Sequence, residues 1–399
     1  MNDQGVLVRE KLAQAVGILN EFEIDAWLTF VRETALSRDP VLDLILGDEM
    51  TWPSAFILTR SGRHIAIVGH YDGVNVRALG GYAEVTGYHQ TIANVLRQTL
   101  EQLAPRQLAL NFSETDVAAD GLTVGMHRRL LRYLAGSGLE ERIVSAESLA
   151  AALRGRKSPA EIERVRRAVH TTEELFDAVE KFVQIGMTQR QIAAFLHAQI
   201  EQRGLGYAWD KAHNPIVTCG PHSPIGHAAP GDIPLERGHM LHIDLGVKQD
   251  DYCSDLQRIW YVLDAGESTA PPEVQNAFRA VYGALKAGEG ALRPGALGWQ
   301  VDAAARQYLT ARGYPEYMHA LGHLLGRMAH DGGAVLGPRW EKYAGICEMP
   351  VAVNNIFTLE LHVIVPERGM VSLEEDVLVT PNGVEYLSHP QTDLRYLRP

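Results

Sequence analysis

The sequence predicts an α/β fold in two domains, residues 1–155 and 156–399. Its 399 residues exceed the ~150 residues that one domain commonly contains. Strand-like and helix-like segments alternate in the first part of the chain, which is typical of a sheet covered by helices. From about Asn214 onward, strands separated by glycines dominate, so we expect a second domain there.

The first domain is predicted to start with a helix, because apolar residues over Val6–Phe22 recur at helical spacing. Continuous or alternating apolar runs then predict three strands, followed by a helix and a short strand. In chain order these segments are Ala26–Phe30, Ala55–Thr59, His64–Val68, Ile92–Leu103 and Leu108–Asn111.

The second domain is predicted to begin with a capped helix. Ser158 suits the N-cap, Pro159 the first helical position, and Glu161 can complete a capping box. Thr188 and Gln191 form a second helix start of the same kind. Further helices are expected at Val274–Lys286 and Gly298–Arg312.

Composition excludes several classes of protein. With 37 Lys and Arg against 49 Asp and Glu, the net charge of −12 disfavours a general binder of nucleic acid or of anionic membranes. Cys219, Cys253 and Cys347 form no CxxC spacing, so neither a disulfide framework nor a zinc finger is expected. No apolar run reaches the ~18 residues of a membrane span, and the charged N-terminal segment lacks a signal core. We expect a soluble cytoplasmic protein.

Two aspartates lie inside apolar, strand-like runs of the second domain. Asp244 is in Met240–Val247 and Asp255 is in Cys253–Val262, with a polar turn between the two runs. This pattern predicts a β-hairpin that can bring both carboxylates to one point. Burying an unpaired carboxylate costs several kcal/mol, so each needs a partner. The alternative is a pair of satisfied aspartates in the core or in a turn.

Three histidines, His319, His323 and His330, lie within twelve residues, among apolar side chains and glycines. The glycines predict a tight approach of the backbone rather than a regular helix. A single histidine in such a setting is more often a core residue, so a functional interpretation depends on the nearby aspartates.

Glutamates interrupt two further strand-like runs. Glu360 lies in Ile356–Val365, and Glu374 and Glu375 lie in Val371–Thr380. Alternation places Glu374 on a polar face and Glu375 on a more apolar one. The pattern alone does not decide which of the two points inward.

The chemistry of these side chains favours a metal site. Carboxylates held close together repel one another and cannot all stay ionised without a cation. Four carboxylates and one imidazole suit two divalent ions that share bridging ligands and activate a water. With oxygen ligands dominating, Mn²⁺, Co²⁺, Zn²⁺ or Fe²⁺ is more plausible than a thiolate zinc site.

The order of these segments resembles that of the pita-bread metallopeptidases, which include methionine aminopeptidase, aminopeptidase P, prolidase and the non-metallic creatinase. The segments are HIDLG with Asp244, Asp255 eleven residues later, HALGHLLG, Glu360 and the LEED-VLVT strand. The two-domain layout and the KSPAEIERVRRA helix are similar to the prolidase and aminopeptidase P branch. The resemblance implies a creatinase-like N-terminal α/β domain followed by a pita-bread α+β catalytic domain.

The resemblance also implies roles for individual residues. Two divalent ions, of manganese, cobalt or zinc, would be bound by Asp244, Asp255, His323, Glu360 and Glu374, with Asp255 and Glu374 bridging. The VLVT frame at 377–380 selects Glu374 over Glu375. Glu360 would also take a proton from the bridging water. His227, His319 and His330 would bind substrate and assist catalysis.

This sequence departs from the family pattern on the substrate side of the site. Glu360 is followed by Leu-His-Val-Ile364 where Glu-Pro-Gly and a nearby Tyr are usual, and Ser372 stands where Arg is common. His362 could replace a missing substrate contact, or it could lie at the surface or merely support a ligand.

The leading prediction is therefore a dinuclear metallopeptidase that cuts the bond before proline in dipeptides or short peptides, as a dipeptidase or an aminopeptidase. The first alternative is a metal-dependent hydrolase or lyase that breaks a C–N bond of another small molecule on the same fold. The second is a binding protein that has lost catalysis, although no predicted ligand is missing. From the resemblance we expect a homodimer with a small peptide substrate, and neither nucleic acid nor membrane as a partner.

Overall fold

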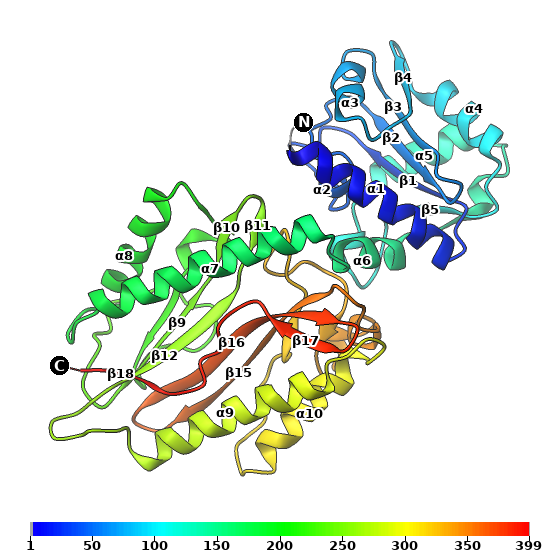
Figure 1. The fold of residues 1–399 in the computed structure, drawn as a ribbon. Coiled ribbons are helices and arrows are strands. Elements are labelled where there is room, and N and C mark those ends of the chain that lie inside the picture. The colour runs from blue at the N-terminus through cyan, green and yellow to red at the C-terminus, as the bar shows by residue number, and fades with distance from the viewer. Residues whose placement is uncertain (1–2, 399) are drawn as a thin grey trace. The chain divides into compact units, whose positions relative to one another are not determined.

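The computed structural model describes residues 3–398 and divides into two compact units, with the boundary between Arg154 and Gly155 (Figure 1). The boundary predicted from the sequence, between residues 155 and 156, lies one residue later. Within the described part of the chain, no helix combines the length and the apolar character needed to cross a membrane.

The first unit is a six-stranded mixed sheet in the order β4-β3-β2-β1-β5-β6, with an apolar core on each face. Neighbouring residues of β1 alternate between these cores, Trp27 entering one and Leu28 the other, as expected for a strand buried on both faces. The predicted α/β layering is thereby confirmed. The elements are α1 (Asp3–Glu21), β1 (Ala26–Val31), α2 (Leu42–Ile45), β2 (Ser54–Thr59), β3 (His64–Gly69), α3 (Gly73–Leu79), β4 (Glu84–Tyr88), α4 (Ala93–Leu103), β5 (Leu108–Leu110), α5 (Val124–Leu134), β6 (Ile143–Ser145) and α6 (Glu147–Gly155), with 3₁₀ turns at Val117–Ala119 and Glu140–Arg142.

The second unit is built on a larger sheet whose main path runs β15-β16-β12-β9-β8, with β17 paired to β16 and β18 to β12. Helices α7 and α8 contact strands of the β8 to β12 half, and α9 contacts β15 and β16 (Figure 1). The elements are α7 (Pro159–Phe182), α8 (Gln189–Gln202), β7 (Gly206–Tyr207), β8 (Ile216–Cys219), β9 (Met240–Leu245), β10 (Val247–Gln249), β11 (Tyr252–Cys253), β12 (Leu256–Val262), α9 (Pro272–Ala291), α10 (Gly298–Thr310), β13 (Gly322–His323), β14 (Val335–Leu336), β15 (Ile356–Val365), β16 (Gly369–Thr380), β17 (Gly383–Tyr386) and β18 (Arg395–Leu397), with 3₁₀ turns at Lys211–His213, Glu341–Tyr343 and Ile346–Glu348.

Both predicted capping boxes are present. The Ser158 hydroxyl accepts a hydrogen bond from the Glu161 amide, and the Glu161 carboxylate accepts one from the Ser158 amide at 2.8 Å. Thr188 and Gln191 make the equivalent pair at the start of α8. These reciprocal bonds satisfy amides that the first helical turn leaves unpaired, which explains why the sequence located both helix starts.

The predicted hairpin is confirmed, with one addition. Strands β9 and β12 pair antiparallel, but the connection folds into the short strands β10 and β11 rather than a simple turn. The reversal uses Asp250 and Asp251, which adopt φ values of 50° and 67°. The register therefore places Gln257, not Asp255, opposite Asp244.

Candidate metal and substrate site

One row across the sheet carries most of the candidate site. Backbone pairing aligns Ile216 with Asp244, Asp244 with Gln257, Gln257 with Glu374, and Glu374 with Glu360. Side chains of directly paired residues point to the same face of a sheet. Three carboxylates from three strands thus lie on one face, with Gln257 between them.

The opposite face of β15 and β16 explains why this row is held firmly. Leu359, Leu361 and Leu373 alternate with the two glutamates and belong to the apolar core that includes α9. Because successive residues of a strand point to opposite faces, burying the leucines directs Glu360 and Glu374 away from the helix.

Asp255 and His323 complete the cluster from outside the row. Asp255 immediately precedes β12, and its amide donates to Asp376 Oδ2 at 3.1 Å. His323 Nε2 lies 3.8 Å from Asp255 Oδ2 and 3.7 Å from Glu360 Oε1. One potential ligand atom from each of Asp255, His323 and Glu374 lies within 4.8 Å of the other two.

A glycine allows the segment of His323 to approach β15. A Cβ atom on Gly322 would lie only 1.9 Å from the Thr358 carbonyl oxygen, so no other residue fits without displacing the backbone. The His323 amide donates to Thr358 Oγ1 at 3.2 Å, and the Glu360 amide donates to the Leu321 carbonyl at 2.7 Å. The prediction of a tight backbone approach instead of a helix is confirmed.

Electrostatics make the cluster unfavourable without a cation. Burial raises the pKa of Glu360 to about 7, and a hydrogen bond from Gln257 opposes that rise. Burial, reinforced by the charges of neighbouring carboxylates, raises the pKa of Glu374, Asp244 and Asp255 well above their usual range. Several buried acids that repel one another are stabilised by a bound cation.

The donor set fits a divalent cation. The buried Asp244 Oδ1 has no hydrogen-bond partner within the described part of the chain. Burial lowers the pKa of His323, which keeps its imidazole neutral, the form that binds metals. No lysine or arginine is found among the described residues that line the cavity of about 400 Å³ above Asp244, Asp255 and Glu374. These residues form a candidate divalent-metal site.

The cluster lies where two cavities of about 400 and 390 Å³ share a wall. One cavity is lined by acids, by histidines and by a group of apolar residues, Ala208, Trp209, Ile216, Met328 and Ala329. The other has a mixed lining, which includes Ile225, Val335 and Met370 as well as Lys342, Tyr343 and Ser372. Between them, the two cavities are lined by every residue predicted for the site: His227, Asp244, Asp255, His319, His323, His330, Glu360, His362 and Glu374.

Four histidines surround the cluster at different depths. The His319 and His362 rings stack with centroids 5.1 Å apart, and His319 Nε2 lies 3.2 Å from His362 Nδ1. The His330 ring lies 4.1 Å from that of His323. His227 is exposed and lines both cavities. The four histidines can therefore face a substrate bound beside the acids.

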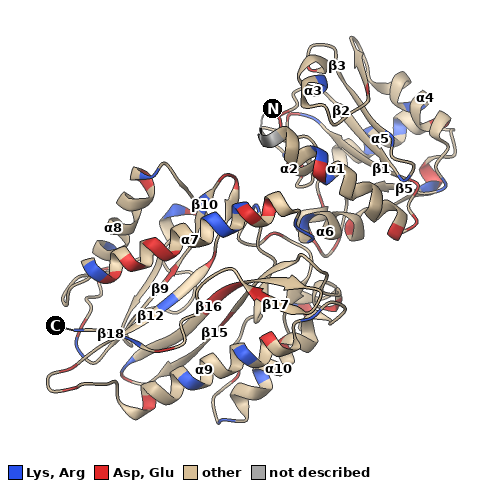
Figure 2. Cartoon of the chain, in the orientation of Figure 1, with Lys and Arg blue, Asp and Glu red and all other residues tan. Residues whose placement is uncertain are grey.

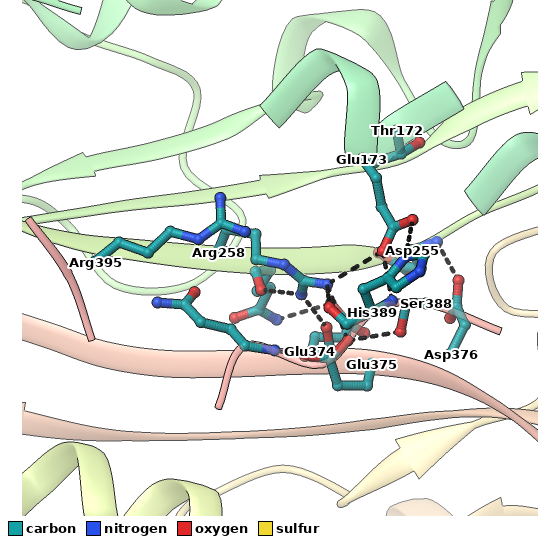
Figure 3. A network of polar contacts seen from close by, with 12 residues as sticks. Thr172, Glu173, Asp255, Arg258, Glu374, Glu375, Asp376, Ser388, His389 and Arg395 are labelled. Atoms are coloured by element: carbon teal, nitrogen blue, oxygen red, sulfur yellow. Dashed lines mark hydrogen bonds and ion pairs between the residues drawn. The ribbon is translucent and has the colours of Figure 1, made fainter. Parts of the chain in front are cut away.

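The two adjacent glutamates of β16 have separate surroundings. Glu374 lies in the carboxylate cluster, whereas Glu375 accepts hydrogen bonds from Arg258 at 3.0 Å and from Ser388 at 2.6 Å (Figure 3). Figure 2 shows this acidic stretch of β16 beside a basic position on β12. Arg258 is 1% exposed, and it also donates to the Glu374 carbonyl at 3.1 Å. This buried ion pair joins β12 to β16 directly behind the cluster.

Sequence reasoning missed Gln257 and Arg258, which support the cluster from its two sides. Gln257 follows Asp255 by two residues, so strand alternation could have placed both on one face. No comparable signal existed for Arg258, because its partners Glu375 and the His389 carbonyl are more than a hundred residues away.

Comparison with known proteins gives one family. The model of metallopeptidase family M24 matches residues 163–381. An uncharacterised peptidase of Staphylococcus saprophyticus is 27% identical over 335 residues, covering 84% of this chain and 87% of the relative. Among the solved structures that share the fold is an Xaa-Pro dipeptidase from Bacillus anthracis, with a TM-score of 0.74 and 20% identity, covering 98% of this chain and 100% of that one. Another is an X-Pro aminopeptidase from Thermotoga maritima, with a TM-score of 0.70 and 23% identity, covering 97% of this chain and 99% of that one.

Proposed function

This chain belongs to metallopeptidase family M24, and we propose that it hydrolyses the peptide bond before proline in dipeptides or short peptides. The observation that carries the proposal is the group of four carboxylates, two buried (Asp255 and Glu374) and two half-buried (Asp244 and Glu360), with His323 beside them. All five residues line the cavity of about 400 Å³. The Xaa-Pro dipeptidase and X-Pro aminopeptidase among the structural neighbours support proline as the recognised residue.

The metal centre in this proposal is dinuclear. The ligands would be Asp244, Asp255, His323, Glu360 and Glu374, and the ions would be Mn²⁺, Co²⁺ or Zn²⁺. Such ions, when bound, supply Lewis acidity and lower the pKa of a coordinated water. The protein contributes the row of paired residues across the sheet, which fixes the positions of Glu360 and Glu374. Among the described residues that line the cavity with Trp209, no lysine or arginine competes with the metal.

We assign the proton transfer to Glu360. Gln257 Nε2 donates to Glu360 Oε2 at 3.1 Å, which leaves Oε1, on the side of His323, as the oxygen that takes the proton. Glu360 would then pass this proton to the proline nitrogen as it leaves. His227, His319 and His330 would hold the substrate and donate to the developing oxyanion.

The two cavities suit the two halves of a short peptide. We propose that the cavity with Trp209 receives an apolar substrate group, because part of its wall is formed by the apolar residues Ala208, Trp209, Ile216, Met328 and Ala329. The second cavity, with Ser372 and His362 where the family pattern differs, would contact the other half.

A substrate panel tests this proposal. With Mn²⁺ present, we expect turnover of Ala-Pro, of Ala-Pro-Ala or of both, and much slower turnover of Ala-Ala, because the site would be shaped around an imide nitrogen. Comparing the two proline substrates also separates a dipeptidase from an aminopeptidase. Turnover of creatine without turnover of either proline peptide would instead favour the C–N hydrolase alternative.

A further inference from the structure

We propose that Gln257 is a positioning residue, whose side-chain amide holds Glu360 and Glu374 in the orientation needed to bind metal. This inference rests on the metal centre proposed above and concerns a residue that belongs to neither the predicted ligand set nor the substrate contacts. It follows from the hydrogen bonds at the two ends of one buried amide.

The donor end of this amide joins the two glutamates. Gln257 Nε2 donates to Glu374 Oε2 at 2.9 Å and to Glu360 Oε2 at 3.1 Å. Gln257 is 6% exposed and pairs directly with Glu374 in the sheet, so water has little access to these bonds. Both amide hydrogens are therefore used on carboxylates from two different strands.

The acceptor end fixes the direction of the amide. Gln257 Oε1 accepts a hydrogen bond from the Ser372 hydroxyl and lies 2.9 Å from His242 Nε2. His242 Nδ1 has no hydrogen-bond partner among residues 3–398, which agrees with the ring proton being on Nε2. A reversed amide would place its oxygen against two carboxylates, which only accept hydrogen bonds when ionised.

This arrangement pre-orients the ligands. Each glutamate has one oxygen bound to Gln257 and the other, Oε1, free of that contact. Carboxylates that are already held in place lose less conformational entropy when the metal binds, so binding is more favourable. Ser372, which stands where the family usually has Arg, thereby gains a defined function: its hydroxyl holds the amide that holds the glutamates.

The direct test is the affinity of metal-stripped protein for Mn²⁺, measured by isothermal titration calorimetry. We expect Gln257→Leu to bind Mn²⁺ about 10- to 100-fold more weakly than the wild type, the usual range for residues that orient metal ligands. Gln257→Asn provides a second variant that keeps a polar side chain in the sheet. Its amide is one methylene shorter and cannot reach both glutamates, so a loss in the same range is expected.

Gln391 offers a matched control. It is also a buried glutamine, 3% exposed. Its side-chain amide bonds the backbone of β12, the strand that carries Gln257: Oε1 accepts from the Ile259 amide at 3.1 Å, and Nε2 donates to the Ile259 carbonyl at 2.9 Å. Gln391→Leu should lower the unfolding temperature and leave Mn²⁺ affinity unchanged, because its side-chain amide does not touch the cluster.

Two results would overturn the inference. One is wild-type Mn²⁺ affinity in Gln257→Leu and Gln257→Asn, and the other is an equal loss in Gln391→Leu, which would indicate a general effect on the sheet. Either result leaves the proposed function intact as long as the wild type binds Mn²⁺ and cleaves Ala-Pro. A wild type that binds no Mn²⁺ would remove the proposed function itself.

Discussion

Glu360→Gln is expected to lower the rate of Ala-Pro hydrolysis by about 10²- to 10⁴-fold, the contribution typical of a positioned general base. The amide that replaces the carboxylate cannot accept the proton of the attacking water. It also presents either an uncharged amide oxygen, which is a weaker acceptor, or an NH₂ group to the Gln257 donor, so the arrangement with Glu374 is disturbed. The rate is measured at saturating Mn²⁺, so that a weaker metal affinity does not dominate the result.

The control for this variant is its stability. Glu360 is one of several acids that repel one another, so removing its charge should not lower the unfolding temperature of the metal-free protein. Glu360→Gln with wild-type turnover would mean that another group takes the proton.

The second large effect distinguishes two neighbouring residues. Glu374→Gln is expected to weaken Mn²⁺ binding by more than the ~100-fold typical of residues that only support a ligand. Glu375→Gln is expected to keep Mn²⁺ affinity near that of the wild type and to lower the free energy of unfolding by about 3 kcal/mol, the lower end for a broken buried ion pair. Glu173, 3.9 Å from the same Arg258 nitrogen, retains part of the compensating charge.

Calorimetry with Mn²⁺ and chemical denaturation of the metal-free proteins measure these two quantities separately. If Glu375→Gln lost Mn²⁺ affinity and Glu374→Gln lost only stability, the alignment of this strand with the family pattern would be wrong by one residue. Equal losses of Mn²⁺ affinity in both variants would mean that the buried ion pair between Arg258 and Glu375, and not the face on which each glutamate lies, determines Mn²⁺ binding.

Local signals explain which elements could be predicted from the sequence. Helix α7, capped by Ser158, and the strands Ala26–Val31 and Ser54–Thr59 depend on capping, periodicity and apolar runs within a few residues of chain. The second sheet is different, because its order brings β8 and β15 to opposite ends of one path. No short-range pattern determines such pairing, whereas the β10–β11 hairpin is local and was missed because its polar residues were interpreted as a simple turn.

The candidate site shows the same limit. Residue types and order were enough to nominate Asp244, Asp255, His323 and Glu360, and all four line one cavity. Alternation left Glu374 and Glu375 undecided, because the partners that distinguish their surroundings come from β12 and from residues after β17.

The central claim is that two divalent ions are held by five side chains of the second unit, and elemental analysis tests it most directly. After saturation with Mn²⁺ and removal of free metal on a desalting column, the wild type should retain two manganese atoms per chain. A variant carrying both Asp255→Asn and Glu374→Gln should retain fewer than one. Wild-type protein that retains no metal after the same treatment would contradict the account, and retention of only one would contradict its dinuclear form.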